Sequence, residues 1–246
     1  AQSMRLPSDA YRLPPDWFPT TLDFTNYKTL FTSDLPMLNM LGNSALVTFS
    51  TIILRLIVAV LAAYAIAKIR YRGSNTVMVG FLASMMLPIQ ATIIPLYIIM
   101  SNLGLVNTRM SLIIIGIFDS FCIFMLKQSM ATIPDSIVES AKIDGAGHMR
   151  ICWQIVVPMI KSSLATMVIL IFNGTWNDYF LPYIFISSWD KMTLPLGINA
   201  LKGYMGSGNQ SVILAAVSFA VTPILIIFLF GQRYIVEGLT ASAVKG

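Results

Sequence analysis

The chain has 246 residues, of which 56% are hydrophobic and only 11% charged, and its formal net charge is +5. Roughly a quarter of the residues of a soluble domain are charged, so this composition excludes an ordinary soluble domain and is typical of an integral membrane protein. The positive charge does not indicate nucleic acid, because the basic residues flank apolar segments and form no patch interleaved with aromatic residues. We therefore expect contact with the lipid bilayer and none with nucleic acid.

Residues 1–40 differ from the rest of the chain in their many prolines. Proline fixes its own φ angle and lacks a backbone N–H, so we expect an irregular external segment here and no second domain. Residues 41–246 are expected to form the transmembrane domain. The prolines of the external segment are Pro7, Pro14, Pro15, Pro19 and Pro36.

Long apolar segments recur after residue 40. A helix needs about 20 residues to cross a bilayer, and continuous apolar segments of this length favour helices over the alternating strands of a barrel. The sequence therefore predicts an all-α fold, a polytopic membrane helical bundle. Its five spans lie near residues 43–68, 76–101, 110–128, 161–188 and 211–232.

The basic residues indicate how the spans are oriented, since Lys and Arg are enriched in cytoplasmic loops. They cluster after the first predicted span, between the third and fourth, and after the last, so we expect that side and the C-terminus to be cytoplasmic. Residues 1–40, the turn around Asn107 and the loop 187–210 would then face outward. An external start without an initiator Met predicts an earlier span, and hence a six-span parent protein. The basic residues are Lys68, Arg70, Arg72, Lys127, Lys142, Arg150, Lys161, Arg233 and Lys245.

The loop 129–160, between the third and fourth predicted spans, is polar. Thr132 can cap a helix and Pro134 suits its first turn. Gly145 would end this helix, and a second segment would run to Pro158, which predicts a helix-turn-helix near the membrane surface.

Small residues and carboxylates meet at the turn of this loop. Small side chains let a partner approach closely, and carboxylates can pair with its basic residues. We predict a docking surface for a cytoplasmic partner; a simple linker between two spans is the alternative. The candidate residues are Glu139, Ser140, Ala141, Asp144, Gly145, Ala146 and Gly147.

Enzyme motifs are missing from the sequence. A single histidine, His148, excludes a His-Glu-x-x-His zinc site, and Gly followed by Lys never occurs, which excludes a phosphate-binding loop of the Gly-Lys-Ser/Thr kind. Cys122 and Cys152 are expected to be unpaired packing residues. We expect no catalytic residue, metal site or bound cofactor in this chain, so any energy from ATP must come through another subunit.

The spacing within the loop resembles the Glu-Ala-Ala loop of ABC importer permeases. Glu139-Ser140-Ala141 precedes Gly145 and then Ile155-x-Val157-Pro158, with Ser140 and Val157 as mild departures. The resemblance covers nearly the whole chain and is closest to carbohydrate-uptake permeases of the maltose-transporter type, in particular their smaller, second permease subunit. Other similar segments are Thr25-Asn26-Tyr27, Asn43-Ser44, Trp176-Asn177-Asp178 with Pro182, Gln232-Arg233-Tyr234, Gly238-Leu239-Thr240 and Lys245-Gly246.

The resemblance implies a type I ABC importer permease fold in a bacterial or archaeal inner membrane. Within it, residues 129–160 would carry the coupling helix, seated on an ATPase subunit that binds ATP and Mg. The implied partners are a second permease subunit, two ATPase subunits and an external solute-binding protein. The flexible loop 187–210 is placed to meet that binding protein; a simple connector between two spans is the alternative. The implied function is import of sugars or oligosaccharides.

Charged groups inside a membrane are costly and mark a function or a buried partner. We expect Arg55 to pair with an aspartate across the bundle. Carboxylates and amides suit sugar hydroxyls, and aromatic rings stack on sugars, so a sugar path is one interpretation of the other polar residues; structural contacts between helices are the other. The candidates are Asp119, Asn173, Trp176, Asn177 and Asp178.

Two other functions remain open at this stage. An ion-coupled secondary transporter would use Asp119 or Asp178 as its ion-binding carboxylate and would need no ATPase. A membrane scaffold would transport nothing. Dependence of uptake on ATP distinguishes the three.

Overall fold

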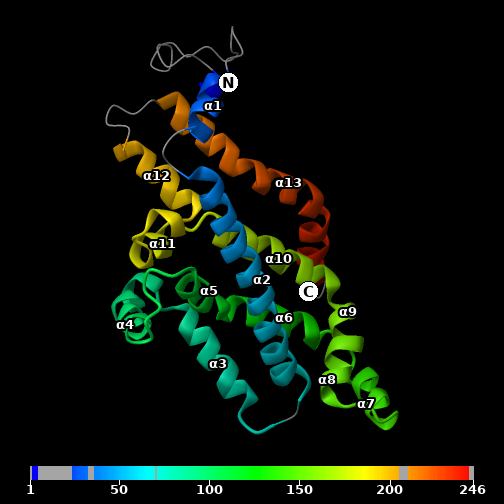
Figure 1. Cartoon of the computed structure of the whole chain (residues 1–246). Helices are drawn as coiled ribbons and strands as arrows, with labels where there is room; N and C mark the ends of the chain where they lie inside the picture. The colour runs from blue at the N-terminus through cyan, green and yellow to red at the C-terminus, as the bar shows by residue number, and fades with distance from the viewer. Residues whose placement is uncertain (1, 5–23, 33–35, 70, 205–209, 244–246) are drawn as a thin grey trace.

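Every regular element in the described part of the chain is a helix, as the sequence predicts. The computed structural model describes residues 2–4, 24–32, 36–69, 71–204 and 210–243; the side chains of 2, 202–204 and 232–243 lie outside that description. The helices form an elongated bundle with the N-terminal end at its top (Figure 1).

Helix α2 (Met37–Lys68) runs through the middle of this bundle (Figure 1). It packs against α5 (Arg109–Ile117), α6 (Ser120–Ala131) and α10 (Lys161–Trp176). Its 32 residues extend about 48 Å at 1.5 Å per residue, which exceeds the roughly 30 Å of a bilayer core. The main hydrophobic core forms around α2.

The described residues contain three helical stretches that are long and apolar enough to cross a membrane. Two bent pairs of helices pass the same test, which gives up to five spans by length and composition. The predicted number of five is compatible with this finding and stays a prediction. The three stretches are Met37–Lys68, Arg109–Ala131 and Gln210–Gly231, and the bent pairs are Ser74–Met85 with Ile89–Asn102 and His148–Met159 with Lys161–Trp176.

The expectation of an irregular segment over residues 1–40 is wrong in part. A short 3-10 helix, η1 (Gln2–Met4), and helix α1 (Thr25–Thr32) both pack against α13 (Gln210–Ala243). Helix α2 already begins at Met37. The prediction treated residues 1–40 as one proline-rich segment, although residues 24–32 contain no proline and can therefore form a helix. Pro7, Pro14, Pro15 and Pro19 lie outside the described residues.

The predicted span 76–101 is divided into α3 (Ser74–Met85) and α4 (Ile89–Asn102), which are bent by 101°. Pro88 precedes α4 with an extended ψ of 138°. A proline disfavours helical geometry in the residue before it, which explains why α3 ends at this point. Pro95 lies inside α4.

The predicted span 110–128 is also interrupted. Phe118 and Asp119 are extended, between α5 and α6. Asp119 Oδ1 accepts hydrogen bonds from the backbone N–H groups of Phe121 at 2.8 Å and Cys122 at 3.2 Å. This is an N-cap, in which a carboxylate satisfies the free donors of a helix start. Asp119 therefore begins a new helix inside the apolar run.

The predicted span 161–188 and the flexible loop 187–210 both need correction. Helix α10 ends at Trp176, and a short helix, α11 (Phe180–Phe185), follows it. The loop contains a 3-10 turn, η4 (Trp189–Lys191), and α12 (Leu194–Tyr204). Gly203 lies within α12, whereas Gly206 and Gly208 lie outside the described residues.

The two ends of α2 are bound to different loops. At its start, Asn43 Nδ2 donates to the carbonyl oxygens of Asp190 and Met192, both at 2.9 Å. Asn107 Oδ1 accepts from the N–H groups of Ser187 and Ser188, so the turn around Asn107 lies at this same end. At its other end, Lys68 contacts residues 133 and 135. These contacts confirm the predicted grouping for the turn around Asn107, the loop 187–210 and the loop 129–160; the side of the C-terminus stays a prediction.

A glycine sets the spacing of α2 and α5. A Cβ added to Gly116 would lie 2.8 Å from Thr51 Cγ2, whereas nothing lies within 4 Å of one added to Gly80 in α3. Gly116→Ala should therefore destabilise the protein by about 1–3 kcal/mol through overpacking. Gly80→Ala should not, because alanine favours a helix by about 1 kcal/mol over glycine. Thermal unfolding of the detergent-purified chain checks this; equal melting temperatures for the two variants would contradict it.

Candidate functional site

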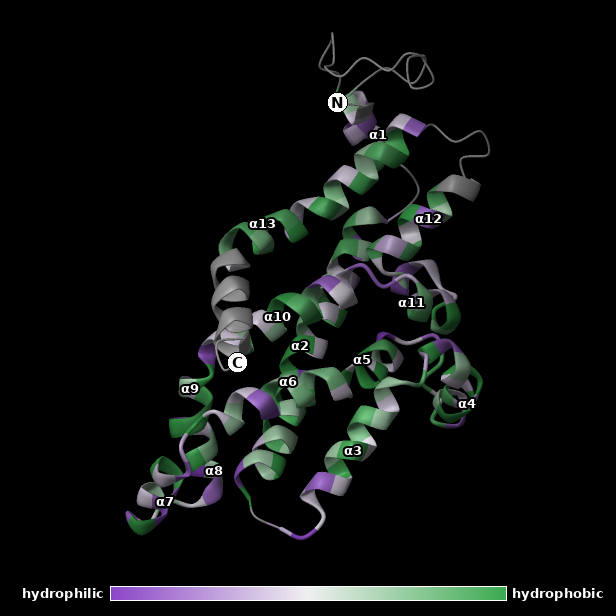
Figure 2. Ribbon diagram, turned by 180° about the vertical axis from the view of Figure 1, so that it is seen from behind, coloured by the Kyte–Doolittle hydropathy of each residue, from purple (hydrophilic) through white to green (hydrophobic). Residues whose placement is uncertain are grey.

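The loop 129–160, called the coupling loop below, projects from the lower end of the bundle (Figure 1). It contains α7 (Asp135–Ile143), α8 (His148–Ile151), one wider π turn, η3 (Cys152–Val156), and α9 (Val157–Met159). Hydrophilic and hydrophobic residues alternate at its tip, whereas α3 and the coloured part of α13 are mostly hydrophobic (Figure 2). Pro158 has no N–H for an ordinary helical hydrogen bond, and the π turn lies just before it. The predicted helix-turn-helix is confirmed.

The turn after α7 depends on Gly145, whose φ is +80°. The N–H of Gly145 donates to the carbonyl of Lys142 at 3.0 Å, and the N–H of Ala146 donates to that of Ala141 at 2.9 Å. This pair of bonds is a Schellman motif, which needs a left-handed residue and therefore favours glycine. The predicted helix end at Gly145 is confirmed, and its backbone conformation explains the residue.

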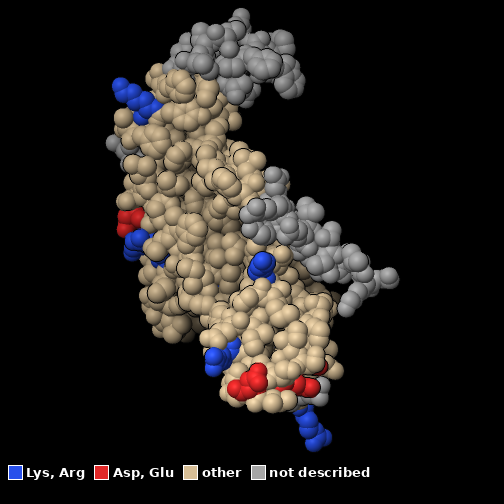
Figure 3. Space-filling view, turned by 90° about the vertical axis from the view of Figure 1, so that its right-hand side faces the viewer, with Lys and Arg blue, Asp and Glu red and all other residues tan. Residues whose placement is uncertain are grey.

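Most of the predicted docking residues form an exposed surface at the tip. Asp and Glu side chains gather there in Figure 3. No atom lies within 4 Å of a Cβ added to Gly145 or Gly147, so this surface is open. The exposed members are Glu139, Ser140, Asp144, Gly145 and Gly147, and Ala146 is half-buried.

Two predictions about this loop are wrong. Ala141 is only 8% exposed and packs in the main core with Val138, so it faces the bundle instead of a partner. Thr132 does not cap α7; it ends α6, and its hydroxyl donates to the carbonyl of Ser129 at 2.9 Å. Pro134 is the residue that precedes α7, without a side-chain cap.

Sequence reasoning missed two apolar residues at the tip. Ile143 is 86% exposed and Met149 is 60% exposed. Exposed apolar side chains beside polar ones are typical of a protein-binding surface. The helical period could have predicted the exposure of Ile143, because Val138 and Ala141 share the buried face of α7 and Ile143 falls on the other side.

Within the bundle, the predicted pairing of Arg55 is confirmed. Arg55 Nη1 lies 2.9 Å from Asp119 Oδ2, with the side chains 16% and 28% exposed. Arg55 Nε also donates to the carbonyl of Gly116 at 2.5 Å. Asp119 therefore uses one oxygen to cap α6 and the other to pair with α2.

The candidates for a sugar path do not share one cavity in the described residues. Trp176 is 4% exposed, and its Nε1 donates to the carbonyl of Ala220 at 3.0 Å, which joins α10 to α13. Asn173 and Asn177 are exposed and hydrogen-bond each other. Asp178, which precedes α11, accepts from the N–H of Phe180 at 3.0 Å. These contacts are the structural ones that the alternative interpretation expects.

Asp178 and Asp119 line two separate hollows. Asp178 and Arg55 line a cavity of about 110 Å³, which is smaller than the roughly 300–1,000 Å³ of ligand pockets. Asp119 faces an open groove of about 530 Å³ at the bend between α3 and α4, together with hydroxyl groups and aromatic rings. The polar and aromatic residues of this groove are Ser84, Thr92, Phe118, Asp119, Ser120 and Phe121. Among the hollows formed by the described residues, the groove at Asp119 has the size of a ligand pocket.

Comparison with known proteins gives a family. A model described as "Binding-protein-dependent transport system inner membrane component" matches residues 55–240, which include the whole coupling loop. Among the described residues, no group of three or more His, Cys, Asp or Glu side chains could hold a metal ion.

Two curated relatives cover most of the chain. The arabinooligosaccharides transport system permease protein AraQ of Halalkalibacterium halodurans is 32% identical over 228 residues, 93% of this chain and 81% of that protein. The inner membrane ABC transporter permease protein YcjP of Escherichia coli is 32% identical over 244 residues, 97% of this chain and 86% of that protein.

The fold also matches a solved structure. It is a crystal structure of a bacterial ABC transporter involved in the import of the acidic polysaccharide alginate, with a TM-score of 0.85. The match covers 95% of this chain and 87% of that chain at 23% identity. The likeness shows an ABC importer permease fold, as the sequence predicts.

The ion pair of Arg55 predicts the effect of removing one partner. Arg55→Met leaves the Asp119 carboxylate unpaired within the bundle and should destabilise the protein by about 3 kcal/mol. Arg55→Met with Asp119→Asn should recover most of this loss, because asparagine can still cap α6. Thermal unfolding in detergent, with Asp119→Asn alone as the control, measures both effects. A single Arg55→Met variant as stable as the wild type would refute the assignment.

Proposed function

Because the chain belongs to the family of binding-protein-dependent transport system inner membrane components, we propose that it is the permease subunit of an ATP-driven importer for sugars or oligosaccharides. The carbohydrate class is supported by AraQ, whose name gives arabinooligosaccharides as its transported solutes and which aligns with 93% of this chain. The permease is a translocation subunit and not an enzyme.

The observation that carries this proposal is the exposed turn of the coupling loop, which lies inside the matched range. Asp144 offers a carboxylate and Ile143 an apolar contact on a surface that projects from the bundle, and Glu139 is exposed beside them with its side chain toward the cavity between α7 and α2. A cleft in a cytoplasmic ATPase subunit is the partner that we propose for it. ATP and Mg are then bound by the ATPase, and nucleotide-driven closure of an ATPase pair moves the permease.

The remaining partners follow from the same proposal. A second permease subunit completes the path, and two ATPase subunits drive it. An external solute-binding protein delivers the sugar near α12 and the loop around it, at the end of α2 opposite to the coupling loop. The coupling loop and the C-terminus are cytoplasmic in this arrangement.

We place this chain's share of the sugar path in the groove that contains Asp119. Its volume of about 530 Å³ falls within the range of ligand pockets. Hydroxyl groups, a carboxylate and two phenyl rings line it, which suits sugar hydroxyls and the apolar face of a sugar ring. The groove is open, so a second permease subunit can close it.

The rival proposal, an ion-coupled transporter, has less support. Asp119 is paired with Arg55 and also caps α6, and Asp178 accepts from backbone N–H groups at the start of α11. Neither carboxylate is presented as a free ion ligand by the described residues. Uptake of radiolabelled arabinooligosaccharide into sealed vesicles should persist with an uncoupler and stop without ATP. Uptake that needs an ion gradient and no ATP would support the rival.

The docking surface predicts the effect of a charge at the turn. Gly145→Asp adds bulk and a carboxylate to the proposed contact and should reduce co-purification of the ATPase and uptake by about tenfold or more. The matched control is Gly104→Asp: Gly104 has a φ of +67° and equally open surroundings, but lies in the turn after α4. Both variants carry similar backbone strain, of about 1–2 kcal/mol. Equal loss in both, or in neither, would contradict docking at Gly145.

A further inference from the structure

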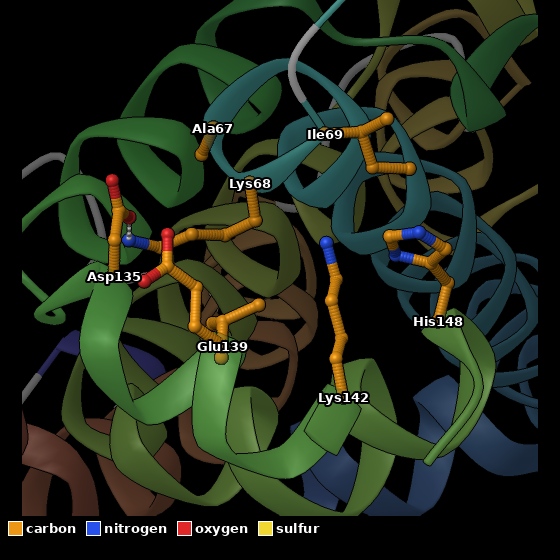
Figure 4. A pocket seen from close by; sticks show the side chains of 8 residues that line it. Ala67, Lys68, Ile69, Asp135, Glu139, Lys142 and His148 are labelled. Atoms are coloured by element: carbon orange, nitrogen blue, oxygen red, sulfur yellow. Dashed lines mark hydrogen bonds and ion pairs between the residues drawn. The ribbon is translucent and has the colours of Figure 1, made fainter. Parts of the chain in front are cut away.

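A cavity of about 320 Å³ separates the last turn of α2 from the coupling loop. Figure 4 shows its lining: Lys68 and Ile69 from the end of α2 face Glu139 and Lys142 of α7, with His148 beside them. Because a cavity intervenes, the two elements are not in continuous apolar contact here. Val138 and Ala141 of α7 pack in the main core with Ala63 and Tyr64 of α2, and the polar side chains that reach across the cavity add to this connection.

Lys68 makes the tightest of these connections. Its side chain is 2% exposed, and its Nζ donates to Asp135 Oδ1 at 2.8 Å. The same ammonium donates to the carbonyl oxygen of Ile133 at 2.6 Å. Ile133 precedes α7 and Asp135 is its first residue, so one cation holds the entry to α7 against the end of α2.

Tyr64 makes a second connection one helical turn earlier. Its hydroxyl lies 3.2 Å from His148 Nδ1, and the two rings meet edge to face with their centroids 6.1 Å apart. His148 is the first residue of α8. Residues i and i+4 lie on one face of a helix, so Tyr64 and Lys68 present one face of α2 to both arms of the coupling loop.

These two contacts constrain motion in a specific way. An ammonium that is almost fully buried is costly without its partners, so displacement of α7 alone would leave Lys68 unpaired. The contact between Tyr64 and His148 of α8 resists rotation of the coupling loop about the contact between Lys68 and Asp135. Movement of the loop therefore carries α2 with it. Farther along α2, Arg55 extends the same connection to Asp119 at the start of α6.

We propose that Lys68, assisted by Tyr64, is a positioning residue that transmits movement of the coupling loop to α2, and through α2 to the membrane-embedded part of the permease. This inference rests on the proposed function, because it assumes an ATPase that moves the loop. Lys68 does not itself contact the ATPase or the transported solute in this scheme. Its removal should separate ATP hydrolysis from movement of the permease.

The test uses the complete complex, with its ATPase subunits and binding protein, in lipid nanodiscs. Leu38, in the first turn of α2 and 65% exposed, is replaced by cysteine as a reporter. Both native cysteines are buried. Labelling of this subunit by a maleimide is timed with and without MgATP and vanadate. In the parent complex, the nucleotide should change the labelling rate by about fivefold or more.

Lys68→Met keeps most of the side-chain length but removes the charge and the donors. This variant should still co-purify with the ATPase and hydrolyse ATP, while the labelling rate becomes independent of nucleotide. Lys68→Arg retains charge and donors and should preserve most of the response. The matched control is Lys127→Met, because among the described residues the Lys127 ammonium donates to the side chain of its neighbour Gln128 and joins no other helix. It should respond like the parent complex.

Further variants keep the proposal testable if Lys68→Met fails to fold. Asp135 is 56% exposed at its side chain, and the amide oxygen of asparagine can still accept from Lys68, so Asp135→Asn should cost less stability than Lys68→Met. Combined with Tyr64→Phe, it removes the carboxylate and the hydroxyl but leaves the packing, and the nucleotide response should fall. A full response in Lys68→Met, or in this double variant, would overturn the inference. A parent complex that binds no ATPase would instead overturn the proposed function.

Discussion

A charge on a membrane-crossing helix must keep its partner, and this requirement fixes the neighbours of α2 at two depths. Arg55 pairs with Asp119 within the bundle, and Lys68 pairs with Asp135 at its end. An unpaired charge in either place would be costly, since little water can solvate it. The break between α5 and α6, the position of α7 and the direction of the coupling loop all depend on these two pairs.

The sequence was sufficient to predict each feature that depends on a single physical requirement. The bundle followed from apolar length, the pairing of Arg55 from the cost of an unpaired charge, and the turn at Gly145 from the need for a left-handed residue. It did not predict the break at Asp119, because Phe118 and Ile117 continue the apolar run up to the capping carboxylate. Helix α12 was missed because the glycines near it suggested flexibility.

The docking surface and the sugar path differ in how far one chain can define them. The exposed tip of the coupling loop belongs to a single loop, so the spacing of its residues was enough to predict where it lies. Ala141 is the exception, because only the packing of the bundle shows that its side chain is buried. Three of the sugar-path candidates, Asp119, Asn173 and Asp178, line separate hollows, and the groove at Asp119 is open on one side. In the proposed arrangement, a path shared between two permease subunits would leave only half of its lining in this chain.

A structure of the assembled complex, determined by cryo-electron microscopy in nanodiscs, tests the central claim most directly. The account predicts that residues 139–147 occupy a cleft of a cytoplasmic ATPase subunit, with Ile143 and the carboxylates of Glu139 and Asp144 in contact with it. It would be contradicted by an assembly in which this turn touches only water or lipid.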